Sequence, residues 1–452
     1  MSVALCELQN RMASVVLRRQ TGRVTQVVGD VVEADLPSAT VGATATIGDV
    51  TCEVIGFKGT GVLLMPLESL VSVSYGSPVL LNNEPLSIPV GEALLGRVID
   101  PLGVTLDGKP ITGCKDRRPL ECRAPSPLKR QRITRSMQTG VRAIDGFLNL
   151  GVGQRVALVA GSGVGKSTLL GMLARESTAD VNVVALVGER GREVREFLER
   201  DLGPEGLKKT VAVVSSSDSS PLLQIKCVQS ALSIAEYFRD QGKDVLLLVD
   251  SLTRMAMAKR QIGLAAGEPP TTRGYTPSVF TMMPRILERA GPGATGGITA
   301  VCTVLVEGDD IHDPVADMVR GIVDGHIILS RKLATHGHYP PIDVLESLSR
   351  TMEATVDGEH ASCAARLRDV LATYRENEEI IRLGAYRKGT SVEVDRAILL
   401  KPKIDTFLKQ DMNEVSGFDE TQMKLRDLTK KATPVKTHRQ SGSSIPSPHP
   451  KQ

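Results

Sequence analysis

The chain has 452 residues, of which 41% are hydrophobic and 24% charged, and this composition is typical of a globular protein with about three domains. Its formal net charge is only +3, and basic and acidic residues are interspersed, so no basic face indicates nucleic-acid binding. The seven cysteines include no Cys-x-x-Cys pair, which favours a reduced, cytosolic compartment over a disulfide framework.

The first 19 residues have a pattern of their own. Apolar residues recur there at helical spacing, which predicts a short amphipathic helix over residues 1–19. Glu7, Asn10 and Arg11 interrupt any secretory signal sequence, and no apolar run in the chain approaches the roughly 20 residues that a membrane span requires. Two interpretations of the helix stay open: it packs on the domain that follows, or it docks a partner protein.

Residues 20–90 consist of short β-type runs separated by turn signals such as Gly29-Asp30 and Gly48-Asp49. This alternation predicts a small β-barrel or sandwich. Residues 91–135 are rich in glycine, proline and charge, and we interpret them as a linker into the next domain.

The clearest motif lies at residues 155–168. Its apolar residues 156–160 predict a buried strand, glycines then free the backbone, and a helix can begin at Lys166. In such a loop, backbone N–H groups and the positive end of the helix hold a phosphate, Lys166 reaches the β- and γ-oxygens, and the Ser167 hydroxyl can bind Mg²⁺. The predicted nucleotide-binding residues of this loop are Ala160, Gly161, Ser162, Gly163, Val164, Gly165, Lys166, Ser167 and Thr168.

Beyond this loop, helical stretches alternate with continuous apolar runs. A run that is apolar on both faces is typical of a parallel sheet covered by helices, so residues 136–352 predict an α/β domain with a nucleotide outside the carboxyl ends of its strands. The predicted strands are residues 181–188, 210–216, 245–250, 299–306 and 326–330.

Charged side chains stand at two of these strand ends. Asp250 ends one strand and is predicted to support Mg²⁺, and Glu189 ends another, where it could orient an attacking water. Arg190 and Arg254 each have two open interpretations, a contact with phosphate oxygens or a structural ion pair. His336 and His338 have no carboxylate or cysteine at ligand spacing and are typical of a loop rather than a metal site.

Several stretches together resemble the catalytic core of the rotary ATP synthase subunits, and most closely the flagellum-specific export ATPases and their virulence type III secretion relatives. The resemblance covers roughly residues 20–410 and implies a RecA-like fold for the P-loop domain. The stretches that carry it are residues 160–168, 188–194 (Gly-Glu-Arg-Gly-Arg-Glu-Val), 248–254 (Leu-Val-Asp-Ser-Leu-Thr-Arg) and 338–350, which begins His-Tyr-Pro-Pro-Ile-Asp and ends Ser-Leu-Ser-Arg.

The resemblance implies a role for each matching residue. ATP and Mg²⁺ would be the cofactors, with Lys166 and Ser167 on phosphate and metal, Glu189 on the attacking water and Asp250 supporting the metal. Tyr339 falls where the family stacks an aromatic ring on the adenine, and Arg350 falls where a neighbouring subunit inserts an arginine finger. The expected catalytic residues are Lys166, Glu189, Arg190 and Arg350; Arg254 and Tyr339 join the nucleotide-binding residues, and Ser167 and Asp250 are the expected metal site.

The resemblance also implies partners. A homo-hexamer would form with the barrel as its collar, a regulatory stator-like protein would bind the N-terminal helix, and a stalk-like coiled coil would occupy the pore beside residues 307–314. Residues 353–431 are helical in pattern and would bind export substrates and their chaperones, although a simple packed helical cap fits the pattern equally. The protein would be cytoplasmic and peripheral to the inner membrane through the export gate. Residues 432–452 are rich in serine and proline and predict a disordered tail.

Four alternatives to a flagellar export ATPase are weighed. Two are a virulence type III secretion ATPase and the catalytic subunit of a rotary ATP synthase. A hexameric RNA translocase is disfavoured because Phe57 and Tyr75 are the only aromatic residues between residues 20 and 90, too few for base stacking. Glu189 at the catalytic position also disfavours a non-enzymatic nucleotide-binding subunit.

Overall fold

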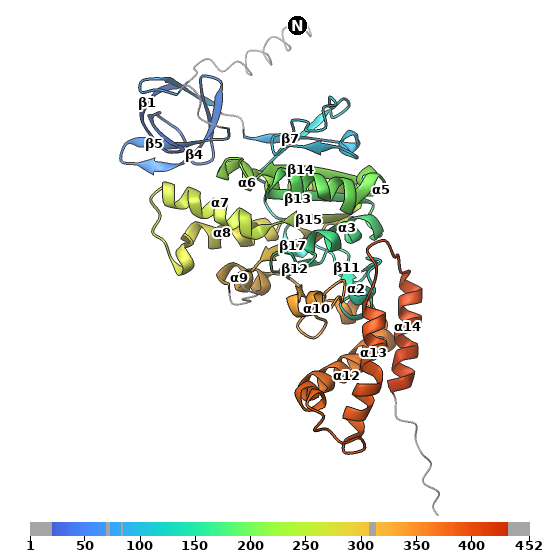
Figure 1. The fold of residues 1–452 in the computed structure, drawn as a ribbon. Helices are drawn as coiled ribbons and strands as arrows, with labels where there is room; N and C mark the ends of the chain where they lie inside the picture. Colours follow the sequence, from blue (N-terminus) through green and yellow to red (C-terminus); the bar gives the residue numbers. More distant parts are fainter. Residues whose placement is uncertain (1–19, 69–72, 83–84, 307–312, 433–452) are drawn as a thin grey trace, which may run out of the picture.

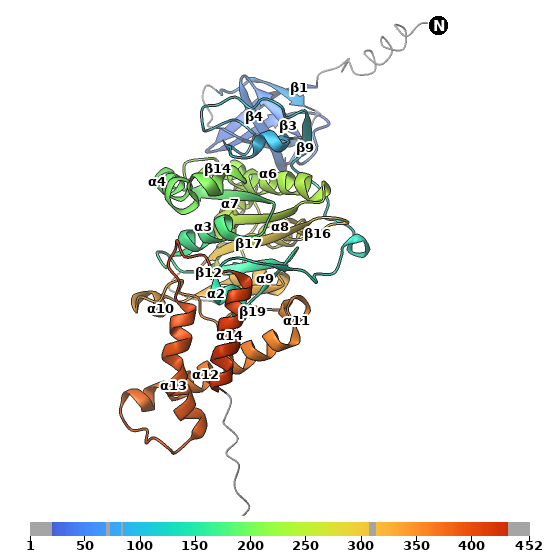
Figure 2. The same ribbon diagram turned by 90° about the vertical axis from the view of Figure 1, so that its right-hand side faces the viewer.

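The computed structural model describes residues 20–68, 73–82, 85–306 and 313–432. These residues form three parts in a row: a β-barrel, a central α/β domain and a C-terminal group of helices (Figures 1 and 2). Three predicted features lie wholly or partly outside the described residues: the N-terminal helix, residues 307–312 of the expected pore-facing stretch 307–314, and the tail from residue 433.

The barrel closes through six antiparallel strands in the order β1-β2-β5-β4-β3-β6. The Gly29-Asp30 turn joins the first two strands, and alternate residues of all six strands fill the interior. The sequence left barrel and sandwich open, and the structure is a barrel. Its strands are β1 (Thr21–Val28), β2 (Val31–Asp35), β3 (Thr44–Ile47), β4 (Val50–Lys58), β5 (Gly61–Pro66) and β6 (Pro78–Asn82).

The predicted linker is more ordered than its composition suggests. It contains β8 (Val98–Ile99), which extends the central sheet beside β14, and β9 (Asp116–Pro119), which pairs with β7 (Ser87–Val90). Leu94, Ile99 and Leu120 are buried in the core of the central domain. These pairings hold the segment against the domain although glycine and proline dominate it locally. Two 3₁₀ turns complete the segment, η1 (Glu92–Leu94) and η2 (Pro127–Lys129).

The central sheet has nine strands, with the order β19-β18-β12-β17-β15-β13-β14-β8 and β16 beside β17. All pairings are parallel except those of β16 and β19. The predicted parallel sheet is therefore confirmed, and 210–216 matches β14 in full. The other strands are β12 (Arg155–Ala160), β13 (Val181–Glu189), β15 (Asp244–Asp250), β16 (Gly291–Pro292), β17 (Gly297–Leu305), β18 (Gly325–Leu329) and β19 (Leu348–Ser349), while β10 (Ser136–Met137) and β11 (Leu150–Gly151) form a separate ribbon.

Helices cover both faces of this sheet (Figures 1 and 2). One core packs α6 to α9 against one set of alternating strand residues, and a second core packs α2 and α3 against the other set. The helices are α2 (Arg142–Phe147), α3 (Lys166–Glu176), α4 (Gly191–Glu196), the π-helical η3 (Phe197–Leu202), α5 (Gly203–Lys208), α6 (Pro221–Asp240), α7 (Leu252–Ala265), η4 (Thr272–Gly274), α8 (Pro277–Leu287), α9 (Pro314–Ile322) and α10 (Arg331–Thr335).

The C-terminal part is helical, as predicted. It contains α11 (Met352–Thr355), α12 (Gly358–Arg382), α13 (Val392–Leu408) and α14 (Phe418–Ala432). Arg142 of α2 anchors it, because its guanidinium donates to the Phe407 and Lys409 carbonyls and pairs with Glu414. Among the described residues, no helix is long and apolar enough to cross a membrane, and none of the six described cysteines is in a disulfide.

Candidate active site

The loop after β12 has the backbone geometry of a phosphate cradle. Gly163 and Gly165 have φ angles of 74° and 97°, in the left-handed region that favours glycine, and α3 begins directly after them at Lys166. A Cβ on Gly165 would also lie 3.8 Å from the Tyr339 ring, so the loop passes close under this side chain. The first N–H groups of α3, which have no partner within the helix, therefore lie just beyond the carboxyl end of β12, where an anion is favoured.

Lys166 lies between two carboxylates, those of Glu189 and Asp250, at the carboxyl ends of the parallel strands. Its Nζ contacts Asp250 Oδ1, and it lies 3.8 Å from Glu189 Oε1. Asp250 also accepts a hydrogen bond of 2.9 Å from the Thr303 hydroxyl of β17, which fixes the carboxylate in position. The neighbouring ends of β12, β13, β15 and β17 thus bring Lys166, Glu189 and Asp250 together, as the parallel sheet predicts.

Glu189 is buried, and the pKa of its carboxyl is raised to about 7, with burial as the largest cause. A hydrogen bond with Glu193 and the charge of Asp250 also contribute to the rise, whereas Lys166 and Arg254 act in the opposite direction. The same hydrogen bond lowers the pKa of Glu193, so this carboxyl stays ionised. Glu189 is therefore poised to change its protonation state near neutral pH.

The two arginines differ in position. Arg254 Nε lies 3.3 Å from Glu189 Oε1, and a Cβ on Gly188 would lie 3.1 Å from the Arg254 side chain, so Arg254 is packed into the site. The Arg190 side chain is 76% exposed and lies 3.8 Å from Glu193, one turn along α4. The structure therefore brings Arg254 into direct contact with Glu189 and leaves Arg190 at the solvent-exposed edge.

The Tyr339 side chain lies beside the phosphate loop, next to Gly165. It is half-exposed, and the peptide bond from Tyr339 to Pro340 is cis. Arg331 of α10 donates a hydrogen bond of 3.1 Å to the Ser162 carbonyl, which ties the segment before Tyr339 to the loop. An exposed ring at this place can stack on a flat base held above the loop.

Arg350 lies near the amino-terminal ends of the parallel strands, whereas the phosphate loop lies at their carboxyl ends. It follows β19, whose Ser349 pairs with Gly325 at the start of β18, while Ala160 of the loop pairs with Leu329 at its end. At about 3.3 Å per residue, these positions are separated by roughly 13 Å along the strand. The exposed Arg350 side chain is therefore not part of the site formed by its own chain.

The residues present fit a nucleotide with Mg²⁺. Glu189 Oε1 and Arg254 Nε are buried and contact each other at 3.3 Å as an ion pair, but neither makes a hydrogen bond of good geometry among the described residues, so both keep hydrogen-bonding capacity for a ligand. Ser167 lies in the first turn of α3, two positions after the left-handed Gly165. Within the described ranges, no three His, Cys, Asp or Glu side chains form a metal cage. This donor set suits Mg²⁺, which keeps its waters and binds one or two protein oxygens plus phosphate.

Three residues of the site were missed by sequence reasoning. Thr303 holds Asp250, Glu193 bonds to Glu189, and Arg331 bonds to the phosphate loop. Glu193 carries a detectable signal, because it lies within the stretch 188–194 that carries the family resemblance, in the first turn of α4. Thr303 and Arg331 are recognisable only once the order of the strands is known.

Comparison with known proteins gives consistent matches. Residues 140–349 match the nucleotide-binding domain of the ATP synthase alpha/beta family, and residues 356–427 match the T3SS EscN ATPase C-terminal domain. The flagellum-specific ATP synthase of Bacillus subtilis is 48% identical over 91% of this chain and 95% of its own. The type 3 secretion system ATPase of Xanthomonas euvesicatoria is 46% identical over 93% of this chain and 97% of its own.

A solved structure agrees with these relatives. The assembled ATPase EscN from the type III secretion system of enteropathogenic E. coli superimposes with a TM-score of 0.86 at 43% identity, over 90% of this chain and 99% of EscN. Family, relatives and structure all cover the phosphate loop and the C-terminal helices together. The chain therefore belongs to the ATP synthase alpha/beta family, within its branch of flagellar and type III export ATPases, and hydrolyses ATP.

Proposed function

We propose that this ATPase energises protein export during assembly of a bacterial flagellum. The observation that carries the proposal is the 48% identity to the flagellum-specific ATP synthase of Bacillus subtilis along nearly the whole length of both chains. A virulence secretion ATPase is the second candidate, since type 3 secretion ATPases match at 46%, 47% and 48%. The near-equality of these identities means that cargo has to be tested directly.

The test is complementation. The gene is expressed in two deletion strains, one lacking its flagellar ATPase and one lacking its type III secretion ATPase. Restored swimming in the first strain alone supports the flagellar role, and restored effector secretion in the second strain alone supports the virulence role. Lys166→Ala protein is the control that must rescue neither.

We assign the roles in hydrolysis as follows. The backbone N–H groups of residues 161–165 and the Lys166 ammonium bind the β- and γ-phosphates, and Tyr339 stacks on the adenine. Glu189, as a carboxylate, accepts a hydrogen bond from the attacking water and aims it in line at the γ-phosphorus. Arg254 holds Glu189 in place through the 3.3 Å contact. Arg190, at the exposed edge beside Glu193, is assigned to phosphate oxygens.

Ser167 and Asp250 are the residues that would hold Mg²⁺, the Ser167 hydroxyl directly and the Asp250 carboxylate through water. When bound, the ion neutralises charge that develops on the phosphate oxygens. For Lys166 to reach the phosphate, its ammonium has to turn away from Asp250, which it contacts in this structure. Thr303 keeps Asp250 oriented through this exchange.

We propose that the working form is a homo-hexamer in which Arg350 serves the neighbour's site. The position of Arg350, roughly 13 Å along β18 from its own loop, supports this assignment. The relative EscN has been solved as an assembled ATPase and in complex with its central stalk EscO. By analogy, a stalk-like coiled coil would bind here too.

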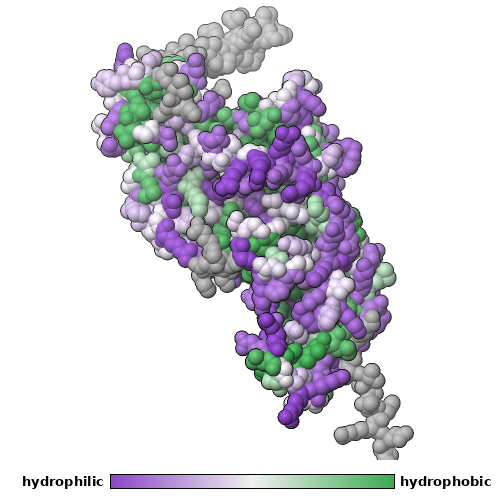
Figure 3. Space-filling model, in the orientation of Figure 1, coloured by the Kyte–Doolittle hydropathy of each residue, from purple (hydrophilic) through white to green (hydrophobic). Residues whose placement is uncertain are grey.

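The remaining partners are proposed from the surface and the sequence. The outer end of the C-terminal helices carries apolar surface (Figure 3), including Leu383, Val392 and Leu399, which are 82%, 63% and 63% exposed. Such a patch suits export substrates and their chaperones. Residues 1–19 are proposed to bind a regulatory stator-like protein, and the complex is proposed to lie at the cytoplasmic face of the inner membrane beside the export gate.

A further inference from the structure

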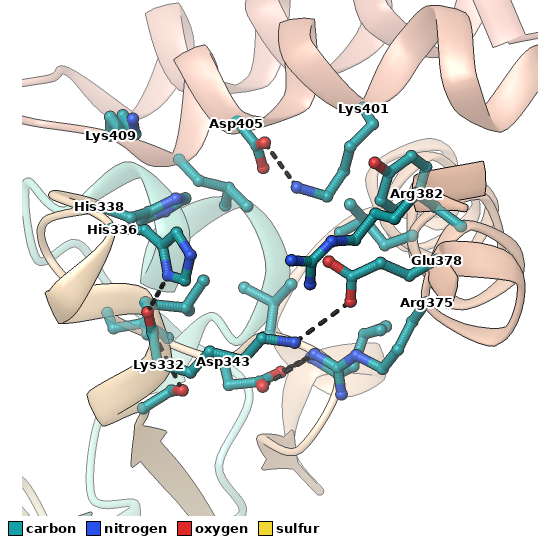
Figure 4. Close-up of a pocket in the computed structure, with 18 residues that line it drawn as sticks. Lys332, His336, His338, Asp343, Arg375, Glu378, Arg382, Lys401, Asp405 and Lys409 are labelled. Carbon is teal, nitrogen blue, oxygen red and sulfur yellow. Dashed lines mark hydrogen bonds and ion pairs between the residues drawn. The ribbon is translucent and has the colours of Figure 1, made fainter. Parts of the chain in front are cut away.

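A cavity lies between the central domain and the C-terminal helices, and its lining residues come from α10 and the segment after it, α12 and the end of α13 (Figure 4). Its volume is about 650 Å³, within the range of small-molecule sites. The floor is apolar and the wall includes the ring of Tyr374. The floor residues are Leu333, Ile342, Val344, Leu345, Leu371 and Leu408.

The charges around this cavity do not balance. Three of its cations pair with its three carboxylates: Lys332 with Glu378 at 3.2 Å, Arg375 with Asp343 at 2.7 Å, and Lys401 with Asp405 at 2.5 Å.

Two more cations line the cavity, Arg382 and Lys409, and neither has an ion pair among the described residues. Figure 4 shows the Arg382 guanidinium turned into the cavity. Cations that share a cavity without counter-charges attract an anion.

A buried polar atom adds a second observation. His338 lines the cavity and is only 5% exposed, yet its Nε2 has no hydrogen-bond partner in the described part of the chain. Burial lowers the pKa of this imidazole, so the ring is neutral at neutral pH. An unpartnered buried nitrogen is costly, and a bound ligand that reaches it removes that cost.

The cavity and the nucleotide site share one short segment. His338 lines the cavity while the next residue, Tyr339, lies beside Gly165 of the phosphate loop. In α10, Lys332 lines the cavity while its neighbour Arg331 bonds to the Ser162 carbonyl. A ligand that moves residues 330–339 would therefore change the nucleotide site directly.

We propose that this cavity is a regulatory site for a small organic anion with a flat apolar body, and that its occupancy is coupled to nucleotide binding through residues 330–339. Arg382 and Lys409 bind the anionic group, and the Tyr374 ring and the apolar floor bind the body. Binding of the anion does not depend on the proposed cellular role. The coupling rests on the proposed nucleotide site.

The binding test uses full-length protein and the anionic fluorophore 1-anilinonaphthalene-8-sulfonate, which becomes bright in an apolar cavity. We expect Arg382→Glu to weaken its binding about fivefold or more, and Lys409→Glu to do the same, because each reverses a charge beside the sulfonate. The matched controls are Arg366→Glu, exposed on α12 outside the cavity, and Lys403→Glu, exposed on α13. Uncharged N-phenyl-1-naphthylamine should bind more weakly than the sulfonate and should not respond to Arg382→Glu.

Equal binding to wild type and Arg382→Glu protein, or an equal loss in the Arg366→Glu control, would overturn the site. Equally tight binding of the neutral analogue would overturn its anion selectivity.

The coupling test measures fluorophore affinity with and without a saturating non-hydrolysable ATP analogue and Mg²⁺. We expect a change of about threefold or more, abolished in Arg331→Ala protein. Unchanged affinity with the analogue shown to be bound would overturn the coupling alone. If the analogue does not bind, the proposed nucleotide site itself fails.

Discussion

Two side chains beside the phosphate loop are proposed to act on different reactants, one on the phosphate and the other on the attacking water. In the proposed mechanism Lys166 contacts ground-state phosphate, so Lys166→Ala should abolish both nucleotide binding and turnover. Glu189 is proposed to act on water, so Glu189→Gln should bind ATP and lower kcat by about 10² or more. Binding of a fluorescent ATP analogue and phosphate release separate the two effects. Glu196→Gln, an exposed change on α4, is the control, and near-normal turnover of Glu189→Gln protein would remove Glu189 from the mechanism.

The ionisation of Glu189 predicts a pH profile. Its pKa is raised to about 7, so the carboxylate form that orients water is lost as pH falls through that value, and kcat/KM should fall with it. The hydrogen bond with Glu193 contributes to the raised pKa. Glu193→Ala should therefore shift the acidic limb to lower pH, whereas Glu196→Ala should leave it in place. An unshifted limb in Glu193→Ala protein would contradict this origin of the pKa.

At the scale of the elements, a buried ion pair joins strand β4 of the barrel to helix α6, which covers the central sheet. Lys226 Nζ lies 2.6 Å from Glu53 Oε2 of β4, and both side chains are largely buried. Lys226→Met leaves the Glu53 carboxylate buried and unpaired, which should cost about 3 to 5 kcal/mol. Adding Glu53→Gln should recover part of that loss, because it removes the charge.

Thermal unfolding measures both variants. The control is Lys58→Met, since Lys58 pairs with Glu33 at 3.5 Å with its own side chain 69% exposed, and such a pair contributes at most about 1 kcal/mol. A Lys226→Met protein as stable as the Lys58→Met protein would mean that the buried pair does not hold the barrel.

Some elements could be predicted from the sequence and others could not, because some depend on a local pattern and others on contacts between distant residues. The strand 210–216 could be read directly, because a continuous apolar run bounded by polar residues is a local signal. The pairing of β8 with β14 could not, because its partner lies about a hundred residues away and the local composition is that of a loop. The same holds in the site. The residues of the loop 160–168 follow from their own spacing, whereas Thr303 approaches Asp250 only because β17 and β15 are neighbours.

At the scale of the whole molecule, activity should belong to an assembly. In the proposed site one chain offers Lys166 and Mg²⁺ to the γ-phosphate, while its own Arg350 lies beside the start of β18, away from the phosphate loop. An arginine supplied in trans contributes roughly 10³ to 10⁵ in rate in other P-loop enzymes. Arg350→Ala should therefore depress turnover with nucleotide affinity nearly unchanged, and specific activity of the wild type should rise with protein concentration as rings form.

Mixing two inactive variants tests the geometry of that assembly. In a ring of Arg350→Ala and Lys166→Ala subunits, an intact phosphate loop from the first can lie beside an intact Arg350 from the second. Random mixing in equal amounts makes about a quarter of the interfaces competent, so partial activity should return. The control is the Lys166→Ala/Arg350→Ala double variant, which carries both lesions in every subunit and should stay inactive. A mixture that stays inactive although mixed rings form, or dilute monomer that hydrolyses ATP at the full rate, would show that Arg350 does not act on the neighbour's nucleotide.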